Sequence, residues 1–267
     1  MPDPFSDMSA AGADFIELAV EVLETRAAEP AMSEGVARYL AALPKDEIRK
    51  AVEVGAGSGP IARQVAAWAP EAEVLATEPA AEFLPHARRL AEGIPNVTFE
   101  AQDGTALELE DGSVDLVIQH TVLSHVPDPV PLLAEAFRVL RPGGWLVVFD
   151  GDFSKGSLSG FPGDPLSACE TYFKQNFVVD PHVCSKLAGL SGAAGFEVAD
   201  FWMIPRLIRK DDGMLAWVKF TTDMMLKKGE IGPELAAGLL AEYARRRDAG
   251  TLFGFQAYGT LIARKPG

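Results

Sequence analysis

Cysteine is nearly absent from this sequence, and so is any long apolar run. Cys169 and Cys184 are its two cysteines, and they form neither a CxxC pair nor another spacing typical of a metal site. Two thiols provide no disulfide framework, so we expect a reducing compartment. No stretch approaches the roughly 20 apolar residues that span a bilayer, and residues 1–10 lack the features of a secretory signal. These absences predict a soluble, cytoplasmic protein without a metal site.

Basic residues are also in short supply. The chain has 24 lysines and arginines against 38 aspartates and glutamates, which gives a formal net charge of −14. Proteins that bind nucleic acid or anionic membranes need clusters of Lys and Arg to meet phosphate groups. We therefore expect neither kind of partner, and we predict a small-molecule substrate. The sequence leaves open whether the chain forms a homodimer.

Strand and helix patterns alternate through most of the chain, and its length fits one large domain with an insertion. This alternation predicts a doubly wound, Rossmann-like α/β fold, with helices on both faces of a mostly parallel seven-stranded sheet. The predicted strands cover residues 51–54, 73–77, 97–101, 114–118, 145–150, 196–203 and 255–263. The predicted helices cover residues 32–43, 59–68, 81–92, 130–140 and 181–194.

The alternation breaks in three places. Residues 1–45 are predicted to be helical, and two more helices are expected within 205–250. Residues 151–165 are rich in Gly, Ser and Pro and are predicted to form a long loop. We therefore expect an α/β core over residues 46–204 and 251–267, with an N-terminal helical segment over 1–45 and a helical insert over 205–250.

The most informative motif is VEVGAGSGP, residues 52–60. A predicted strand that contains Glu53 turns through Gly55, Gly57 and Gly59 into a helix, and glycines there let a ligand approach the backbone. Glu78 closes the next predicted strand, where an acid is placed to bind ribose hydroxyls. A dinucleotide site has the spacing G-x-G-x-x-G, whereas this chain has G-x-G-x-G after an acid. The spacing argues against a nicotinamide dehydrogenase and suits a ligand that carries an ammonium and a sulfonium.

Residues from about 50 to 150 resemble the class I S-adenosylmethionine-dependent methyltransferases. Among these the chain is most similar to the ubiquinone/menaquinone-biosynthesis type and its small-molecule, natural-product relatives. The resemblance is carried by Val52–Pro60, Thr77-Glu78-Pro79, Gln102-Asp103-Gly104, Val114–Pro129 and Leu140–Asp150. The closing segment YGTLIARKP resembles, more loosely, the antiparallel last strand of that family.

The resemblance implies S-adenosylmethionine as cofactor, S-adenosylhomocysteine as product, and a role for each matching residue. The cofactor-binding residues it implies are Glu53, Gly55, Gly57, Gly59, Glu78, Pro79, Asp103, Gly104 and His120. The first three line the methionine end, and Gly59 opens the helix. Glu78 binds the ribose, while Pro79, Asp103 and Gly104 surround the adenine. His120 offers its backbone carbonyl to the cofactor's amino group.

Two histidines are candidates for catalysis. Methyl transfer from a sulfonium depends mainly on positioning, and it requires a base when the nucleophile carries a proton. His125 follows the fourth predicted strand, on the side of the sheet where open α/β folds bind ligands. His182 begins a predicted helix that is expected to face the same crevice. A purely structural role for either histidine stays open.

Helical segments outside the core are candidates for a lid. Trp217, Phe220 and Met224 recur at helical spacing within the insert 205–250, and the sequence leaves open whether they form core or substrate wall. The resembling family often uses this insert as a lid. We therefore expect it, the segment after Asp150 and the N-terminal helices to close over the substrate.

These observations favour methyl transfer to an oxygen, carbon or nitrogen atom of a small secondary-metabolite or quinone-like molecule. One alternative keeps the cofactor site but catalyses a cyclisation or rearrangement without transferring the methyl group. Another is a protein that senses the cofactor or binds a partner without catalysis. The cofactor motifs are compatible with all three, and the sequence does not identify the substrate.

Overall fold

The structure is a computed structural model that describes the chain from Ala13 to Gly267, with side chains described from Ile16 onward. The first part of the expected N-terminal segment, residues 1–12, lies outside the described residues. None of the described helices is long and apolar enough to cross a membrane.

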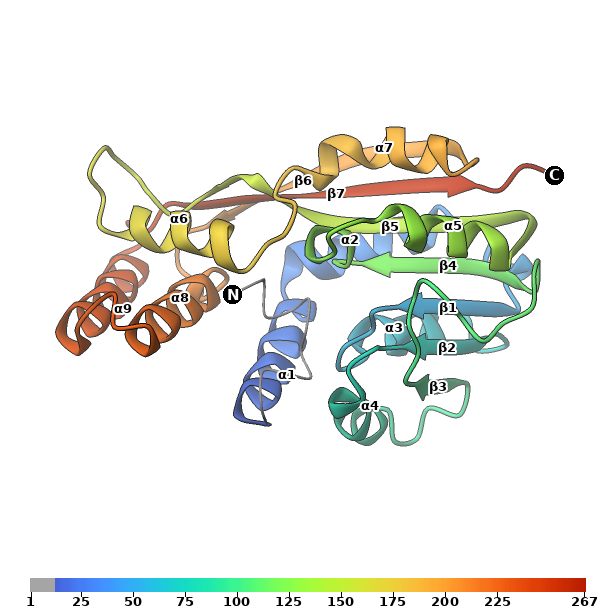
Figure 1. The fold of residues 1–267 in the computed structure, drawn as a ribbon, viewed down its shortest axis with the longest axis horizontal. Coiled ribbons are helices and arrows are strands. Elements are labelled where there is room, and N and C mark those ends of the chain that lie inside the picture. Colours follow the sequence, from blue (N-terminus) through green and yellow to red (C-terminus); the bar gives the residue numbers. More distant parts are fainter. Residues whose placement is uncertain (1–12) are drawn as a thin grey trace.

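A single mixed sheet organises the described chain (Figure 1). The order of its strands is β3-β2-β1-β4-β5-β7-β6, and the first five strands along the chain pair in parallel. β7 runs antiparallel to both β5 and β6. The strands are β1 (Lys50–Val54), β2 (Glu73–Thr77), β3 (Val97–Glu100), β4 (Val114–His120), β5 (Leu140–Ser157), β6 (Glu197–Ile208) and β7 (Gly254–Arg264). The predicted mostly parallel sheet with an antiparallel last strand is confirmed.

Helices cover both faces of this sheet and extend beyond one end of it (Figure 1). The α-helices are α1 (Ala13–Ala27), α2 (Pro30–Ala41), α3 (Pro60–Trp68), α4 (Leu84–Leu90), α5 (Val130–Val139), α6 (Leu166–Asn176), α7 (Val183–Ala193), α8 (Leu215–Lys227) and α9 (Pro233–Ala249). Short 3-10 turns lie at Lys45–Glu47, Ala81–Phe83 and Leu123–His125. We call α6, α8 and α9 the cap, because they lie together at the end of the sheet toward which β1, β2 and β4 point (Figure 1).

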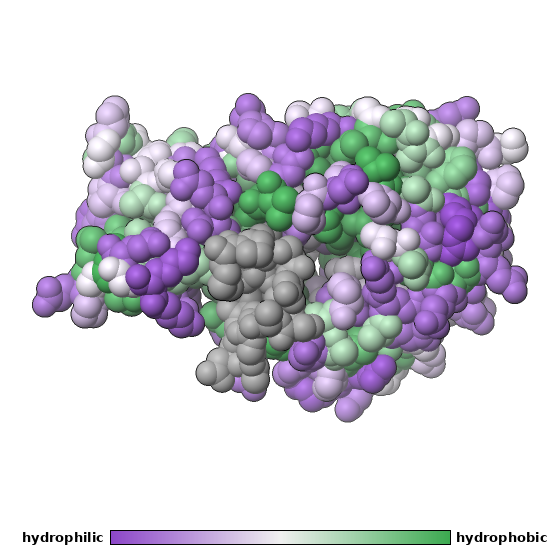
Figure 2. All heavy atoms as spheres, in the orientation of Figure 1, coloured by the Kyte–Doolittle hydropathy of each residue, from purple (hydrophilic) through white to green (hydrophobic). Residues whose placement is uncertain are grey.

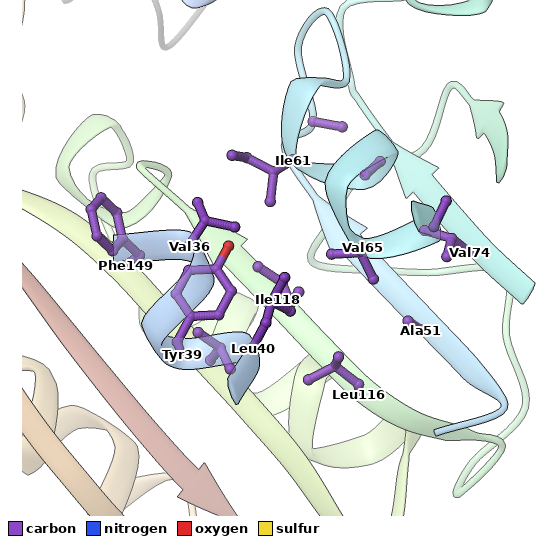
Figure 3. Packing of buried hydrophobic residues seen from close by; sticks show 14 of the residues in the cluster. Val36, Tyr39, Leu40, Ala51, Ile61, Val65, Val74, Leu116, Ile118 and Phe149 are labelled. Atoms are coloured by element: carbon purple, nitrogen blue, oxygen red, sulfur yellow. The ribbon is translucent and has the colours of Figure 1, made fainter. Parts of the chain in front are cut away.

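Two apolar layers hold the sheet between its helices. One layer contains Tyr39 of α2, Val65 of α3 and Ile118 of β4, and Figure 3 shows these side chains pointing toward one another. The other layer packs α5 and α7 against the opposite face, with Leu133, Leu187 and neighbouring strand residues. Burial on both faces explains why β1 and β4 carry apolar residues at adjacent positions, such as Ala51-Val52 and Leu116-Val117-Ile118.

The expectation of a long loop over residues 151–165 is wrong in its first half. β5 continues to Ser157, and Asp150, Gly151 and Asp152 pair with Gly259, Tyr258 and Ala257 of β7. The glycine-rich composition suggested a loop, but a long antiparallel partner supplies backbone hydrogen bonds that local propensity does not reveal. β6 likewise runs to Ile208, beyond its predicted end at residue 203, because it pairs with β7 along its length.

Helix α6, at Leu166–Asn176, is not predicted from the sequence. It buries Leu166, Cys169 and Phe173 in an apolar cluster that joins the extension of β5 to α8 and α9. The cap therefore has an apolar core of its own next to the core of the sheet.

On the face of the molecule that Figure 2 shows, hydrophilic residues predominate, and apolar residues form smaller patches among them.

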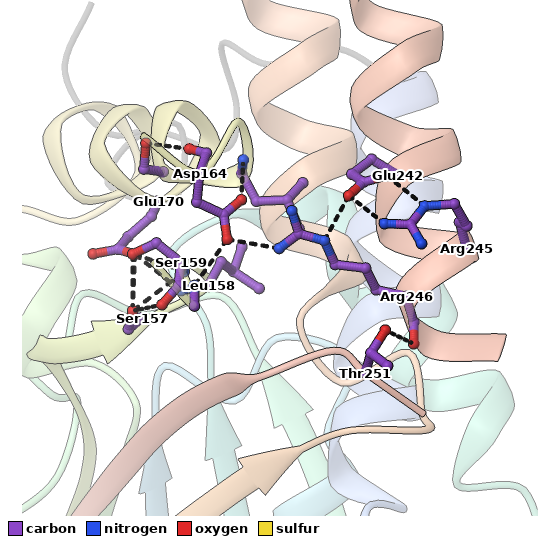
Figure 4. A network of polar contacts seen from close by, with 12 residues as sticks. Ser157, Leu158, Ser159, Asp164, Glu170, Glu242, Arg245, Arg246 and Thr251 are labelled. Carbon is purple, nitrogen blue, oxygen red and sulfur yellow. Dashed lines mark hydrogen bonds and ion pairs between the residues drawn. The ribbon is translucent and has the colours of Figure 1, made fainter. Parts of the chain in front are cut away.

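A buried ion pair fastens the cap to the segment after β5 (Figure 4). Arg246 of α9 donates to Asp164 at 2.6 Å and to Glu242 at 2.6 Å, and the Asp164 side chain is completely buried. The backbone N–H groups of Gly160 and Leu166 also donate to the Asp164 carboxylate. Burial works to raise the pKa of Asp164, but these hydrogen bonds outweigh it and hold the pKa below its ordinary value.

We expect Asp164→Asn to lower the free energy of unfolding by about 3–5 kcal/mol, because it leaves the Arg246 charge buried with one partner removed. A lowered pKa stabilises the fold above the ordinary carboxyl pKa, and this contribution is lost as the pH falls below it. Urea unfolding at pH 7 and at a pH well below 3.8, the ordinary pKa of this carboxyl, measures both effects. The control is Asp212→Asn, which removes an exposed partner of Arg247 and should cost less than about 1 kcal/mol. Equal losses in the two variants would contradict the structural role of Asp164.

Candidate functional site

The carboxyl ends of β1, β2, β4 and β5 meet at one edge of the sheet, because these strands are parallel and in register. Val54 pairs with Thr77 and Gln119, and His120 pairs with Phe149. A cavity of about 570 Å³ lies at this edge, bounded by the strand ends, by α1 and by the cap. Cavities of this size hold small organic ligands in other proteins.

The turn between β1 and α3 forms one wall of the cavity. Gly55, Gly57 and Gly59 all have positive φ angles, of 71°, 54° and 79°, a region that side chains rarely adopt. Gly55 and Gly57 line the cavity, whereas Gly59 is the N-cap of α3 and lies behind it. A Cβ atom on Gly59 would lie 2.3 Å from the Phe99 ring, so the third glycine serves close packing.

Glu53 is a buried acid whose side chain lines the cavity. Its Oε2 atom has no hydrogen-bond partner among the described residues. Burial raises the pKa of Glu53 to about 8, and the nearby negative charge of Glu78 contributes to the rise. An orphaned carboxylate oxygen of this kind is suited to a cationic ligand group, which would stabilise its ionised form.

Glu78 follows β2 and is held by the glycine turn. The N–H of Gly57 donates to its Oε2 at 2.9 Å, and the N–H of Ala80 donates to its Oε1 at 3.0 Å. Burial raises the pKa of Glu78 although both hydrogen bonds oppose the rise. A carboxylate has about four acceptor sites, so Glu78 can accept further hydroxyl donors from a ligand. Pro79 lines the cavity beside it.

Asp103, Gly104 and His120 also line the cavity, as expected. Asp103 is exposed, and its Oδ1 atom accepts hydrogen bonds from Thr105. The His120 ring instead lies in the core, where it stacks on Phe149 at 4.3 Å. Burial lowers the pKa of His120 well below its ordinary value, so its ring is neutral. The role expected for its backbone carbonyl stays a prediction.

Thr121, directly after β4, has a strained backbone. Its φ is 56°, and it is the one residue other than glycine with positive φ among those described. Its hydroxyl donates to the His120 carbonyl at 2.7 Å and accepts from Arg26 of α1 at 2.8 Å. Conformations of this kind cost about 1–3 kcal/mol and cluster at functional sites. The positive φ of Thr121 turns the chain directly after β4, and Thr121 itself lines the cavity.

His125 lines the cavity beside a buried acid that sequence reasoning missed. Asp150 is fully buried at the level of the cavity, and its carboxylate accepts hydrogen bonds from the N–H groups of Ser124 at 3.0 Å and Gly151 at 2.7 Å. Burial raises the pKa of Asp150, and the charge of His125 opposes that rise. The two side chains therefore interact. The signal available in the sequence was an aspartate after the fifth apolar run, at the edge where strand ends gather.

His182 lies elsewhere. It is the exposed N-cap residue of α7, and it is not among the residues that line the cavity. Its N–H donates to Asp180 at 3.0 Å. The structure thus does not bring His182 to the cavity that His125 lines, because α7 packs on the face of the sheet and His182 is exposed at its start.

The cap and the extended strands β5 and β6 supply a second wall of the cavity, which the sequence motifs did not reveal. Trp217 and Phe220 line the cavity, whereas Met224 does not. Phe153 from β5 and Phe173 from α6 join them, and no motif in the sequence identifies these two residues. On the same side, Arg206 of β6 forms a buried ion pair with Glu29, just before α2, and both line the cavity. These residues come from segments far apart in the chain, so tertiary packing alone assembles them.

The chain is similar in sequence to known methyltransferases. Residues 52–148 match a family model described as a methyltransferase domain. Methyltransferase str3 of Strobilurus tenacellus is 34% identical over 176 residues, which cover 60% of this chain and 58% of that protein. Trans-aconitate 2-methyltransferase of Deinococcus radiodurans is 38% identical over 113 residues, which cover 42% of each chain. The chain spans about half the length of the curated relatives that it matches.

One solved structure with the same fold is the [4+2]-cyclase SpnF. It has a TM-score of 0.61 and 19% sequence identity, and the match covers 99% of this chain and 97% of that one. At this identity the likeness shows the shared fold alone. The matched family segment contains the three glycines, Glu53 and Glu78, whereas Asp150 follows it.

Glu53 gives the ligand-free protein a distinctive pH dependence. With a pKa near 8 when folded and 4.5 as its ordinary value, Glu53 binds more protons in the folded state between these limits. Stability should therefore fall as the pH rises from about 5 to 8, by up to about 1.4 kcal/mol per pH unit from this group. Glu53→Gln should flatten the slope in chemical unfolding, while Glu78 and Asp150 retain part of it. Parallel curves for both proteins would show that Glu53 is not protonated in the fold.

Proposed function

We propose, from the premise that residues 52–148 form the core of a class I S-adenosylmethionine-dependent methyltransferase, that this chain binds S-adenosylmethionine and methylates a small organic molecule. The acceptor would be an oxygen, carbon or nitrogen atom of a secondary metabolite or quinone-like compound. The observation that carries the proposal is the orphaned, buried oxygen of Glu53 beside the G-x-G-x-G turn. It would meet the ammonium of the cofactor where a pyrophosphate would be repelled.

The residues present fit that cofactor along its length. Glu53, Gly55 and Gly57 would hold the methionine end, and Glu78 would accept hydrogen bonds from the ribose hydroxyls. Pro79, Asp103 and Gly104 would surround the adenine, with the carbonyl of His120 at the amino group. S-adenosylmethionine supplies a methyl group on a sulfonium, so the acceptor atom forms its new bond to carbon while the electron pair of the broken bond returns to sulfur.

We expect calorimetry to detect binding of S-adenosylmethionine and S-adenosylhomocysteine, and no comparable binding of NAD. Glu78→Ala should weaken binding by about 1.5–3 kcal/mol, the usual loss for a hydrogen bond to a charged group. Binding at pH 7 should also release a proton, because an ammonium beside Glu53 favours its ionised form. Titrations in buffers of different ionisation enthalpy measure this release, and Glu53→Gln should abolish it. Full affinity in Glu78→Ala would remove the ribose assignment.

His125 is the group that we propose to accept a proton from the substrate, with Asp150 as its positioning residue. Two backbone N–H groups hold Asp150 within β5, directly after Phe149, where the pairing of β5 with β4 ends, and its charge interacts with His125. A carboxylate fixed beside an imidazole helps to orient the ring for proton transfer. The pair lies at the strand edge where the acceptor atom would meet the methyl group.

Helix α1 and the insert over residues 205–250 would close the site from solvent. Glu24 of α1 accepts a hydrogen bond from Ser58 at 2.7 Å and pairs with Arg63 at 2.5 Å, which ties α1 to the glycine turn. Leu18 and Val22 of the same helix pack against the apolar cluster of the cap. α1 therefore bridges the core and the cap over the cavity. Exclusion of water there would protect the reaction.

Two other functions use the same cofactor site: a cyclisation or rearrangement without methyl transfer, and cofactor sensing without catalysis. A metabolite extract incubated with S-adenosylmethionine labelled in its methyl group separates them from methyl transfer. Transfer should release S-adenosylhomocysteine and label an extract component. Binding of S-adenosylmethionine without release of S-adenosylhomocysteine would favour the cyclisation or the sensing function.

Turnover of the acceptor found in that screen should fall by about 10²–10⁴-fold in His125→Ala, the usual contribution of a general base. Asp150→Asn should lower kcat and shift its pH profile, while cofactor affinity stays within about twofold. His182→Ala is the matched control, because His182 is exposed outside the cavity, and it should leave turnover unchanged. If His125→Ala retains turnover within a few-fold, the reaction proceeds by positioning alone and His125 is not the base.

A further inference from the structure

The end of the cavity beneath the cap has a wall made of stacked aromatic rings. Phe173 of α6 and Trp217 of α8 are nearly parallel, with ring centroids 4.5 Å apart and planes 3° apart. Phe153 of β5 stacks on Trp217 at 5.9 Å and on Phe173 at 6.2 Å. All three rings line the cavity, together with Phe220. A flat ligand ring that enters the cavity can extend this stack.

The aromatic wall starts beside His125. The rings of His125 and Phe153 meet edge to face, with centroids 6.1 Å apart. A ring that stacks on the wall would therefore hold its substituents close to the His125–Asp150 pair. The position suits a ring with a hydroxyl group, whose proton His125 could accept.

The charges around the cavity oppose an anionic substrate. Among the described residues that line it, acidic side chains outnumber lysines and arginines by seven to three; without the paired Glu29 and Arg206, and without Glu53, whose pKa of about 8 leaves it mostly protonated at neutral pH, five acids remain against two cations. Arg206 already pairs with Glu29, and Arg26 donates to Thr121. The third cation, Lys219, is exposed. A molecule with several carboxylates would meet a net negative wall, whereas a neutral ring loses little on leaving water.

From these observations we propose that the substrate is a flat, uncharged, apolar ring system that carries a hydroxyl group, and that Trp217 is the residue that selects it. The inference rests on the proposed function and specifies its substrate class. The aromatic wall binds the ring, the His125–Asp150 pair faces the hydroxyl, and the excess of acids excludes polyanions.

The test uses 2-naphthol as a neutral probe and citrate as a trianionic one. Binding of each to the full chain is titrated by ligand-observed NMR, with and without saturating S-adenosylhomocysteine. We expect 2-naphthol to bind, more tightly with the cofactor product present, and citrate not to bind. Trp217→Leu should weaken 2-naphthol binding by about tenfold, equivalent to about 1.4 kcal/mol.

Phe177→Leu is the matched control. Phe177 is a buried ring of the same cluster and stacks on Phe173 at 5.1 Å, but it is not among the cavity-lining residues. This variant should lose stability as Trp217→Leu does and keep its affinity for 2-naphthol within about twofold. Equal loss of affinity in both variants, or citrate binding as tightly as 2-naphthol, would overturn the proposal. Absence of S-adenosylhomocysteine binding would instead overturn the proposed function. In that case the titrations of 2-naphthol and citrate without S-adenosylhomocysteine still test whether the aromatic wall binds a neutral ring.

Discussion

The parallel register of β1 between β2 and β4 decides where each functional group of this protein lies. Because Val54 pairs with both Thr77 and Gln119, the residues that follow these three strands emerge at one level of the sheet edge. Asp150 reaches the same level from β5, and its two backbone hydrogen bonds hold it there. A slip of one residue would turn the side chains of a strand to the opposite face. The apolar layers on both faces of the sheet prevent such a slip.

Three buried acids at this edge are retained at a cost in stability. Burial raises the pKa values of Glu53, Glu78 and Asp150, which means that the fold disfavours their ionised forms. Hydrogen bonds from backbone N–H groups offset part of the cost for Glu78 and Asp150. Glu53 and Glu78 line the cavity, and Asp150 interacts with His125, which also lines it. Perturbed carboxyl groups that gather at one place are typical of binding and catalytic sites. A ligand group that pairs with the unpartnered oxygen of Glu53 would offset the remaining cost of burying this acid.

The aromatic wall and the groups proposed for the cofactor come from different parts of the chain. The groups proposed for the cofactor come from the strand ends and glycine turn of the core, whereas the aromatic wall comes from β5, α6 and α8. Phe173 and Trp217 pack the apolar core of the cap and also face the cavity. Changes in the cap can therefore alter the shape of the substrate end while the core strands keep their register. The buried pair of Asp164 and Arg246 keeps that wall attached to the sheet.

The sequence by itself determined the α/β class, five of the seven strands to within two residues at each end, and a local motif in which Glu53 precedes three glycines. Periodicity and glycine spacing are local properties, so they survive in a single sequence. Only the tertiary structure decided that β5 continues past Asp150, that α6 forms, and that His182 lies outside the cavity. Those outcomes depend on pairing with β7 and on packing between segments far apart in the chain. The side chains of Phe153 and Phe173 line the cavity for the same reason, because long-range contacts place them there and no local pattern marks them. Asp150 had a local signal, its position after the fifth apolar run, but only the fold decided its burial beside His125.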